Sequence, residues 1–142
     1  MTKRLAMIAF TVAMLFGLSP ATAQADLDYG VGSGAQVAVL PGAFGLPEMA
    51  FPFLNGKVCA PPNTCVPIYY MNTAEFLGTD LAVQSMDDGV AKLDQWIRNT
   101  PGKKIAMGHS LGASVIYRWL RQYSHDPSEP PPSELSFITM GT

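Results

Sequence analysis

Residues 108–112 constrain the fold of this chain more than any other segment, because they place Ser110 between two closely spaced glycines in the sequence G-H-S-L-G. The apolar run 104–107 before them is typical of a buried strand, and residues 113–123 after them predict a helix. The pattern G-x-S-x-G between a strand and a helix indicates a nucleophile elbow, which exposes the serine hydroxyl above the sheet edge. The alternative is a chance match, because the pattern fixes three residues of common types. With these flanks, we favour Ser110 as a catalytic nucleophile.

The remaining elbow residues have different expected tasks. Gly108 and Gly112 keep the turn free of side chains, so that strand and helix can pack closely around it. The side chain of His109 is expected to point away from Ser110 and to pack or hydrogen-bond behind the turn. His125, the other histidine of the chain, follows a predicted helix about 18 Å long at ~1.5 Å rise per residue, and so lies near the opposite end of the sheet. The sequence therefore offers no credible histidine base for the serine.

Two backbone N–H groups are candidates for holding the oxyanion formed when a serine attacks an ester. The N–H of Leu111 begins the helix that follows the elbow. The N–H of Ala43 follows the predicted strand 36–40, and the glycine before it lets the backbone N–H turn toward the site. The alternative for the Pro-Gly pair at 41–42 is an ordinary turn that ends a strand.

The first 25 residues are predicted to be a secretory signal peptide. Lys3 and Arg4 give a basic start, and residues 5–18 form an apolar run shorter than a typical membrane span. The small-x-small sequence that follows predicts cleavage between Ala25 and Asp26. The alternative is that this segment is retained as an anchor helix. We therefore expect a protein that is secreted or associated with the cell envelope or membrane.

The composition argues against several other classes of function. The formal net charge is −2, removal of residues 1–25 takes away two basic side chains, and no basic cluster is present. A nucleic-acid partner is therefore not expected. The glycine-rich residues 30–34 precede a predicted strand instead of following one, which argues against a dinucleotide site. The sequence has no zinc or calcium ligand spacing, so neither a metal nor a cofactor is expected.

The two cysteines, Cys59 and Cys65, enclose a short loop that contains two prolines. An exported protein meets oxidising conditions, which favours a local disulfide between them. Two free buried thiols are the alternative.

The order of predicted elements indicates an α/β fold. Strands are predicted at residues 36–40, 66–70, 104–107 and 135–140, and helices at residues 81–99, with Asp80 as N-cap, and 113–123. Alternation of strands and helices favours a mostly parallel sheet with flanking helices, and the near-continuous apolar strands suit burial on both faces. Residues 26–35 are expected to form an extended leader, and residues 36–142 the domain itself.

Residues 37–42, the helix that ends near Trp96, the elbow and the sequence P-P-S-E-L-S-F-I at 131–138 together resemble the PE-PPE domain of mycobacteria. This family belongs to the α/β-hydrolase superfamily and is similar to cutinases and lipases. The resemblance implies an exported serine esterase or an acyltransferase that acts on lipid-like or small esters. It carries Ser110 over as the nucleophile, and Ala43 and Leu111 more loosely as oxyanion donors.

The resemblance covers residues 36–142, which correspond to about the first half of that domain. In the family, the acid and the histidine follow the strand that matches 135–140, whereas this sequence stops at Gly141-Thr142. We therefore expect a partial α/β-hydrolase fold, truncated before those strands, that is weak or inactive alone or is complemented by a separate C-terminal half. The alternative is a non-catalytic secreted remnant whose apolar loop, residues 44–53, binds lipid or a protein partner.

Overall fold

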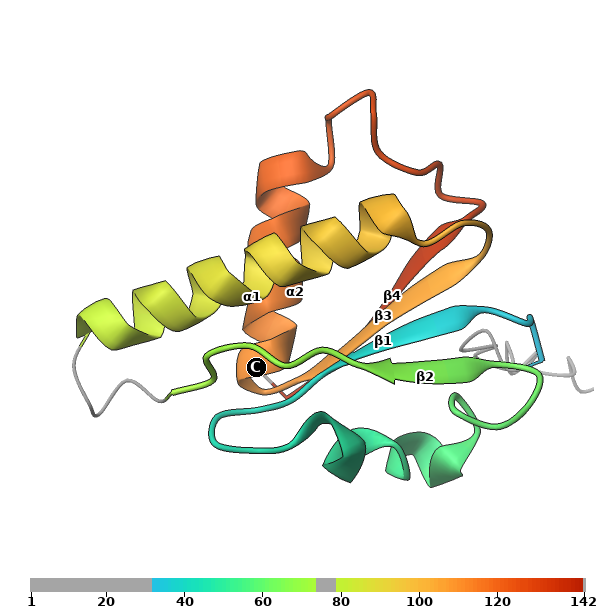
Figure 1. Cartoon of the computed structure of the whole chain (residues 1–142), viewed down its shortest axis with the longest axis horizontal. Coiled ribbons are helices and arrows are strands. Elements are labelled where there is room, and N and C mark those ends of the chain that lie inside the picture. Colours follow the sequence, from blue (N-terminus) through green and yellow to red (C-terminus); the bar gives the residue numbers. More distant parts are fainter. Residues whose placement is uncertain (1–31, 74–78, 142) are drawn as a thin grey trace, which may run out of the picture.

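A computed structural model of the chain describes residues 32–73 and 79–141. It shows four parallel strands in the order β2-β1-β3-β4 (Figure 1). The strands are β1 (Gln36–Leu40), β2 (Thr64–Pro67), β3 (Lys104–His109) and β4 (Leu135–Met140); the helices are α1 (Thr79–Asn99) and α2 (Leu111–Tyr123), with 3-10 turns η1 (Pro47–Ala50) and η2 (Phe53–Gly56). The expected signal peptide, and most of the expected leader, lie outside the described residues.

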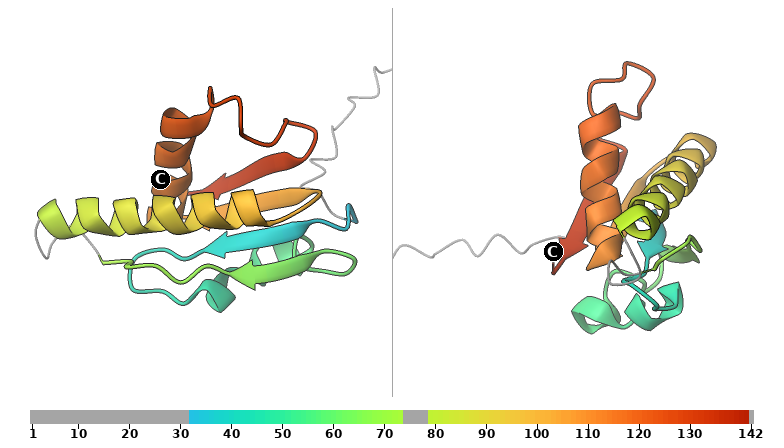
Figure 2. Two further views of the ribbon diagram at one scale, coloured as in Figure 1. Left: turned by 45° about the horizontal axis from the view of Figure 1, so that its top comes forward. Right: turned by 90° about the vertical axis from the view of Figure 1, so that its left-hand side faces the viewer.

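The sheet is the middle of three layers, with α1 and α2 on one face and the η1–η2 segment on the other (Figures 1 and 2). Residues 37–40 of β1 are apolar without interruption because both faces of this strand are buried. Ala38 and Leu40 belong to the core on the helix side, whereas Val37 and Val39 belong to the core on the η side. Successive side chains of a strand point to opposite faces, so a strand covered on both faces is apolar throughout. The expected α/β architecture with a parallel sheet is confirmed.

Several element boundaries differ from the sequence-based expectation. Strand β2 covers Thr64–Pro67 instead of residues 66–70, because its pairing with β1 begins where Gln36 faces Thr64. Its proline stands at the end of an edge strand, a position where a missing N–H is tolerated. Helix α1 begins at Thr79, so Asp80 lies in its first turn and is not the N-cap.

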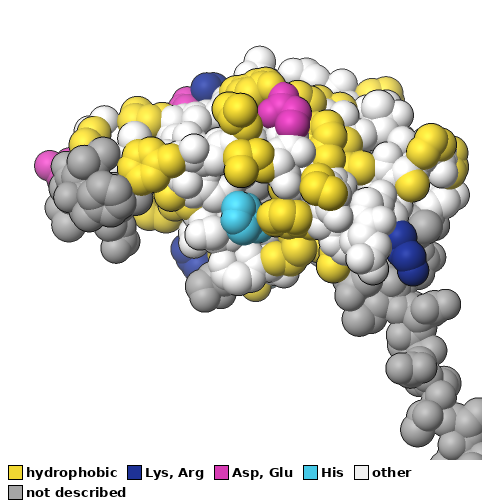
Figure 3. All heavy atoms as spheres, turned by 90° about the horizontal axis from the view of Figure 1, so that it is seen from below, with side chains coloured by type: hydrophobic (Ala, Val, Ile, Leu, Met, Phe, Trp, Pro, Cys, Tyr) yellow, Lys and Arg dark blue, Asp and Glu magenta, His cyan; other side chains and the backbone are white. Residues whose placement is uncertain are grey.

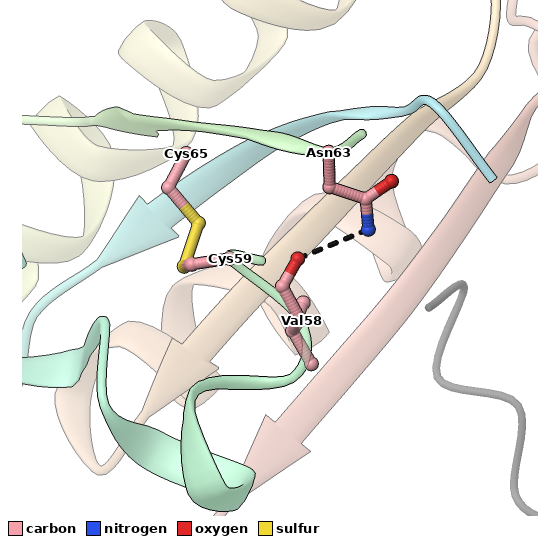
Figure 4. Close-up of a disulfide and its surroundings, with 4 residues drawn as sticks. All are labelled: Val58, Cys59, Asn63 and Cys65. Atoms are coloured by element: carbon pink, nitrogen blue, oxygen red, sulfur yellow. Dashed lines mark hydrogen bonds between the residues drawn. A yellow bond between two sulfur atoms is a disulfide. The ribbon is translucent and has the colours of Figure 1, made fainter. Parts of the chain in front are cut away.

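The cysteines and a buried asparagine attach the segment after η2 to the sheet (Figure 4). Cys59 and Cys65 form a disulfide that joins this segment to β2. The Asn63 side chain accepts a hydrogen bond from Ala35 N–H at 2.9 Å and donates one to the Val58 carbonyl at 3.0 Å. Buried amides are costly unless such bonds are made, so Asn63 fixes the path of the chain into β2.

Charged side chains attach the end of α1 to the segment before β4. The Arg98 guanidinium lies 2.8 Å from Asp94, 2.6 Å from Glu129 and 3.4 Å from Asp126. Hydrogen bonds from the backbone N–H and the hydroxyl of Ser128 hold the pKa of Asp126 below its usual range, and a hydrogen bond from Arg98 makes a smaller contribution in the same direction. The polar face of α1 is therefore not wholly solvated, and its C-terminal turn makes specific ionic contacts.

No helix within residues 32–73 and 79–141 has the length and apolar character needed to cross a membrane.

Helices α1 and α2 approach each other closely at Gly89. A Cβ atom at this position would lie 2.7 Å from Cγ2 of Val115 in α2 and 3.0 Å from Cδ2 of Tyr70. Val115 is fully buried and Tyr70 nearly so, and close-packed cores yield little to added atoms. The absence of a side chain on Gly89 therefore sets the spacing between the two helices.

We predict that Gly89→Ala destabilises the protein, although alanine is the better helix former. Overpacking typically costs about 1–3 kcal/mol, which exceeds the gain of roughly 0.5–1 kcal/mol from helix propensity. Urea unfolding monitored by circular dichroism would measure the change in the free energy of unfolding. Ala91→Gly, at an exposed site of the same helix, measures the propensity contribution alone. A Gly89→Ala protein more stable than the parent would show that the helices are not in close contact here.

Candidate active site

Ser110 is the single residue between the end of β3 and the start of α2, and its backbone has a conformation that L-residues rarely adopt. Its φ is 52° and its ψ is −119°, a region that costs about 1–3 kcal/mol and persists only where the surroundings impose it. Here the Ser110 N–H donates to the Met140 carbonyl of β4 at 2.9 Å, and its carbonyl accepts from Ser114 N–H at 3.1 Å. The neighbouring strand and the first turn of α2 therefore hold the strained residue in place.

The Ser110 hydroxyl is exposed and is not used to cap α2. A serine at the N-cap of a helix commonly accepts a hydrogen bond from a backbone N–H two or three residues later. The unusual backbone angles turn this side chain away from that task, and no such cap bond is present at Ser110. The hydroxyl therefore lies exposed to solvent at the carboxyl edge of the sheet.

The two elbow glycines are required by close backbone contacts. A Cβ atom at Gly108 would lie 2.5 Å from the carbonyl oxygen of Gly112, and one at Gly112 would lie 2.4 Å from the carbonyl oxygen of Leu40. Backbone atoms cannot move aside as a flexible side chain can. Strand β3 therefore turns directly into α2, and the start of α2 rests on the end of β1.

The contact between Gly112, at the start of α2, and Leu40, at the end of β1, brings the two expected oxyanion donors to one end of the sheet. Leu111 N–H is the first of α2, and Ala43 N–H lies three residues past the end of β1, whose last residue is paired with Gly108. Within the described part of the chain, neither N–H makes a hydrogen bond. N–H groups at a helix start and in a tight loop are suited to binding a negatively charged oxygen.

Two residues that the sequence analysis did not identify fix the loop that carries Ala43. The Tyr70 hydroxyl donates to the Pro41 carbonyl at 2.7 Å, and burial raises the pKa of this hydroxyl above its usual range, so it remains a donor. The Asn72 side-chain amide donates to the carbonyls of Gly42 and Gly45, at 2.9 and 2.7 Å. The backbone carbonyl of Asn72 in turn accepts a hydrogen bond from the Phe44 N–H at 2.8 Å. The segment after β2 therefore holds this loop at several points.

Neither histidine is placed to act as a base for Ser110. The His109 ring packs edge-on against Phe53, with centroids 5.2 Å apart, on the face of the sheet that carries η1 and η2. His125 follows the far end of the thirteen-residue α2, roughly 20 Å from its start at 1.5 Å per residue. Residues 32–73 and 79–141 contain no cluster of three or more His, Cys, Asp or Glu side chains that could hold a metal ion.

The parallel sheet with flanking helices defines a partial α/β fold, with a strand–serine–helix turn at its carboxyl edge. A family model described as the PE-PPE domain matches residues 57–142, and the chain belongs to this family. Over 57 residues the chain is 39% identical to SL1278 acyltransferase Chp1 of Mycobacterium tuberculosis, which covers 40% of this chain and 14% of that protein. The chain thus spans a small part of the length of this relative. No solved structure matches the chain significantly.

The backbone strain at Ser110 predicts that a residue able to adopt a positive φ without strain makes the protein more stable. Ser110→Gly should unfold with a free energy about 1 kcal/mol higher than that of Ser110→Ala, because glycine adopts a positive φ without strain. Thermal or urea unfolding of the two variants measures this difference. Both lack the hydroxyl, so the comparison isolates the backbone. Equal stabilities, or a more stable alanine variant, would contradict the conformation described for Ser110.

Proposed function

We propose that the chain supplies the nucleophile and the oxyanion donors of a site that transfers acyl groups from lipid-like esters. The observation that carries the proposal is the strained, uncapped Ser110 beside the unbonded N–H groups of Ala43 and Leu111. Membership of the PE-PPE domain family and the similarity to a protein described as an acyltransferase support the same class of reaction. Hydrolysis and acyl transfer share the first step and differ in the acceptor.

In the proposed reaction, Oγ of Ser110 bonds to the ester carbonyl carbon. The negative charge on the carbonyl oxygen is held by the N–H groups of Ala43 and Leu111, and loss of one such donor typically costs about 2.7–4 kcal/mol of transition-state stabilisation. The carbon–oxygen bond to the alcohol then breaks, and the alcohol leaves with the proton that a base has taken from the serine. Water releases the acyl group in an esterase, and a second alcohol accepts it in an acyltransferase.

The base and its carboxylate partner are proposed to come from a complementing C-terminal segment. This follows from the positions of His109 and His125, neither of which faces Ser110. Such a segment would pack beside β4, whose outer edge has no paired strand among the described residues. The predicted signal peptide, residues 1–25, would direct the protein to the cell envelope or the exterior.

A second candidate function is binding of lipid without catalysis. Phe44, Leu46 and Met49 are 57, 60 and 66% exposed in the loop that follows β1, which is unusual for large apolar residues in a soluble domain. Figure 3 shows hydrophobic side chains gathered around a histidine on the face seen from below Figure 1. If the protein instead catalyses acyl transfer, the same surface would bind the apolar part of the ester.

A fluorophosphonate probe tests the catalytic proposal. Attack by Oγ of Ser110 forms an oxygen–phosphorus bond and releases fluoride, while buffer takes up the proton. We expect slow labelling that peptide mass spectrometry locates at Ser110 and that Ser110→Ala abolishes. Ser136→Ala, at an exposed serine of β4, is the matched control and should label as the parent does. Hydrolysis of short p-nitrophenyl esters should be barely above the blank.

Two outcomes would change this assignment. Robust ester turnover that depends on Ser110 would show that the chain contains its own base. A folded protein that resists the probe, yet binds vesicles through the Phe44–Met49 loop, would favour the second candidate function.

A further inference from the structure

We propose that His109 is a positioning residue whose imidazole sets the distance between the Ala43 oxyanion donor and Ser110. The role rests on the proposed function, because it concerns the same oxyanion site. It concerns the placement of the donor and not proton transfer, since the ring lies on the η1–η2 side of the sheet.

The first observation is the contact between the imidazole and Gly42. A Cβ atom built on Gly42 would lie 2.6 Å from Cε1 of His109, 3.0 Å from Nε2 and 3.3 Å from Nδ1. Three ring atoms at these distances mean that the imidazole lies directly against the glycine backbone. No other residue type fits at position 42 without displacing either the ring or the loop.

The second observation is the support on the other side of the ring. Phe53 of η2 meets the imidazole edge-on, with an interplanar angle of 90°. The ring is thus enclosed between the η2 segment and the loop after β1. Edge-to-face aromatic pairs are worth about 0.5–1.5 kcal/mol beyond their buried area, so the contact with Phe53 favours the observed orientation of the ring.

The third observation is that the contact joins two neighbours of the reacting groups. His109 directly precedes Ser110, and Gly42 directly precedes Ala43. The hydrogen bonds from Tyr70 and Asn72 tie the loop to the segment after β2, whereas the imidazole ties it to the end of β3. A change in the ring would therefore move the donor relative to the nucleophile.

The chemistry of the ring indicates that it acts through its shape. Nδ1 of His109 is buried and has no hydrogen-bond partner within the described residues. A ring held by its polar atoms would have such a partner, because unpaired buried polar groups are costly. A flat apolar ring should therefore replace the imidazole, whereas an aliphatic or a missing side chain should not.

The decisive experiment is a double-mutant cycle between positions 42 and 109, read by the rate of Ser110 labelling. His109→Ala should slow labelling by about tenfold or more, a part of the roughly hundredfold to thousandfold loss that is typical when one oxyanion donor is removed outright. His109→Phe should lose no more than about threefold, because a flat ring remains in contact with Gly42. Gly42→Ala should slow labelling as well, and the double alanine variant should be less impaired than the two single effects predict. His125→Ala is the matched control and should label like the parent.

A second measurement reads the contact without any reaction. Hydrogen exchange at the Phe44 amide, which donates to the Asn72 carbonyl, should speed up in His109→Ala and Gly42→Ala but not in His109→Phe. Unfolding midpoints show whether each variant is folded, and if His109→Ala is unfolded, His109→Gln takes its place in the cycle.

The outcomes separate the two proposals. Labelling of a folded His109→Ala or His109→Gln protein at the parental rate, equal loss in His109→Phe and His109→Ala, or strictly additive effects at the two positions would overturn the positioning role. Absence of labelling in the parent protein would overturn the proposed function. In that case the hydrogen-exchange cycle still decides whether the imidazole sets the position of the loop.

Discussion

The positive φ of Ser110 is the constraint on which the rest of the site depends. It lets β3 pass into α2 without a linker, which places the first N–H groups of the helix beside the serine hydroxyl. The turn closes because Gly108 and Gly112 allow backbone atoms to touch, and because the Met140 carbonyl accepts the Ser110 N–H. The pairing of β3 with β4 and the packing of α2 on the sheet offset the cost of the strained backbone conformation of Ser110.

The loop after β1 is held in a different way. It contains no regular strand, so its position depends on side chains from elsewhere in the chain: Tyr70 and Asn72 by hydrogen bonds, and His109 by contact. Groups that hold a charge during reaction are effective when they are fixed beforehand. Under the proposed function, the several independent contacts on this short loop would fix its N–H groups in this way.

The sequence predicted the fold well because the fold follows from periodicity and residue type. The apolar runs at 36–40 and 135–140 and the stripe of α1 each report local burial, and each became an element with nearly the expected bounds. The limits of β2 depend on its register with β1, which a pattern within one segment does not contain. The tight turn at Ser110, with its flanking glycines, could be predicted from local spacing. Tyr70 and Asn72 could not, because their contacts join residues about thirty positions apart.

The hydrogen bond from Ser110 to the last residue of β4 has a consequence for synthesis. During synthesis the residues of the elbow are added to the chain before Met140, and domains generally fold as units. A nascent chain that has released only β3 and α2 lacks the carbonyl that holds the serine backbone. The strained conformation of Ser110 is therefore held in place only after the fourth strand has been translated and has joined the sheet.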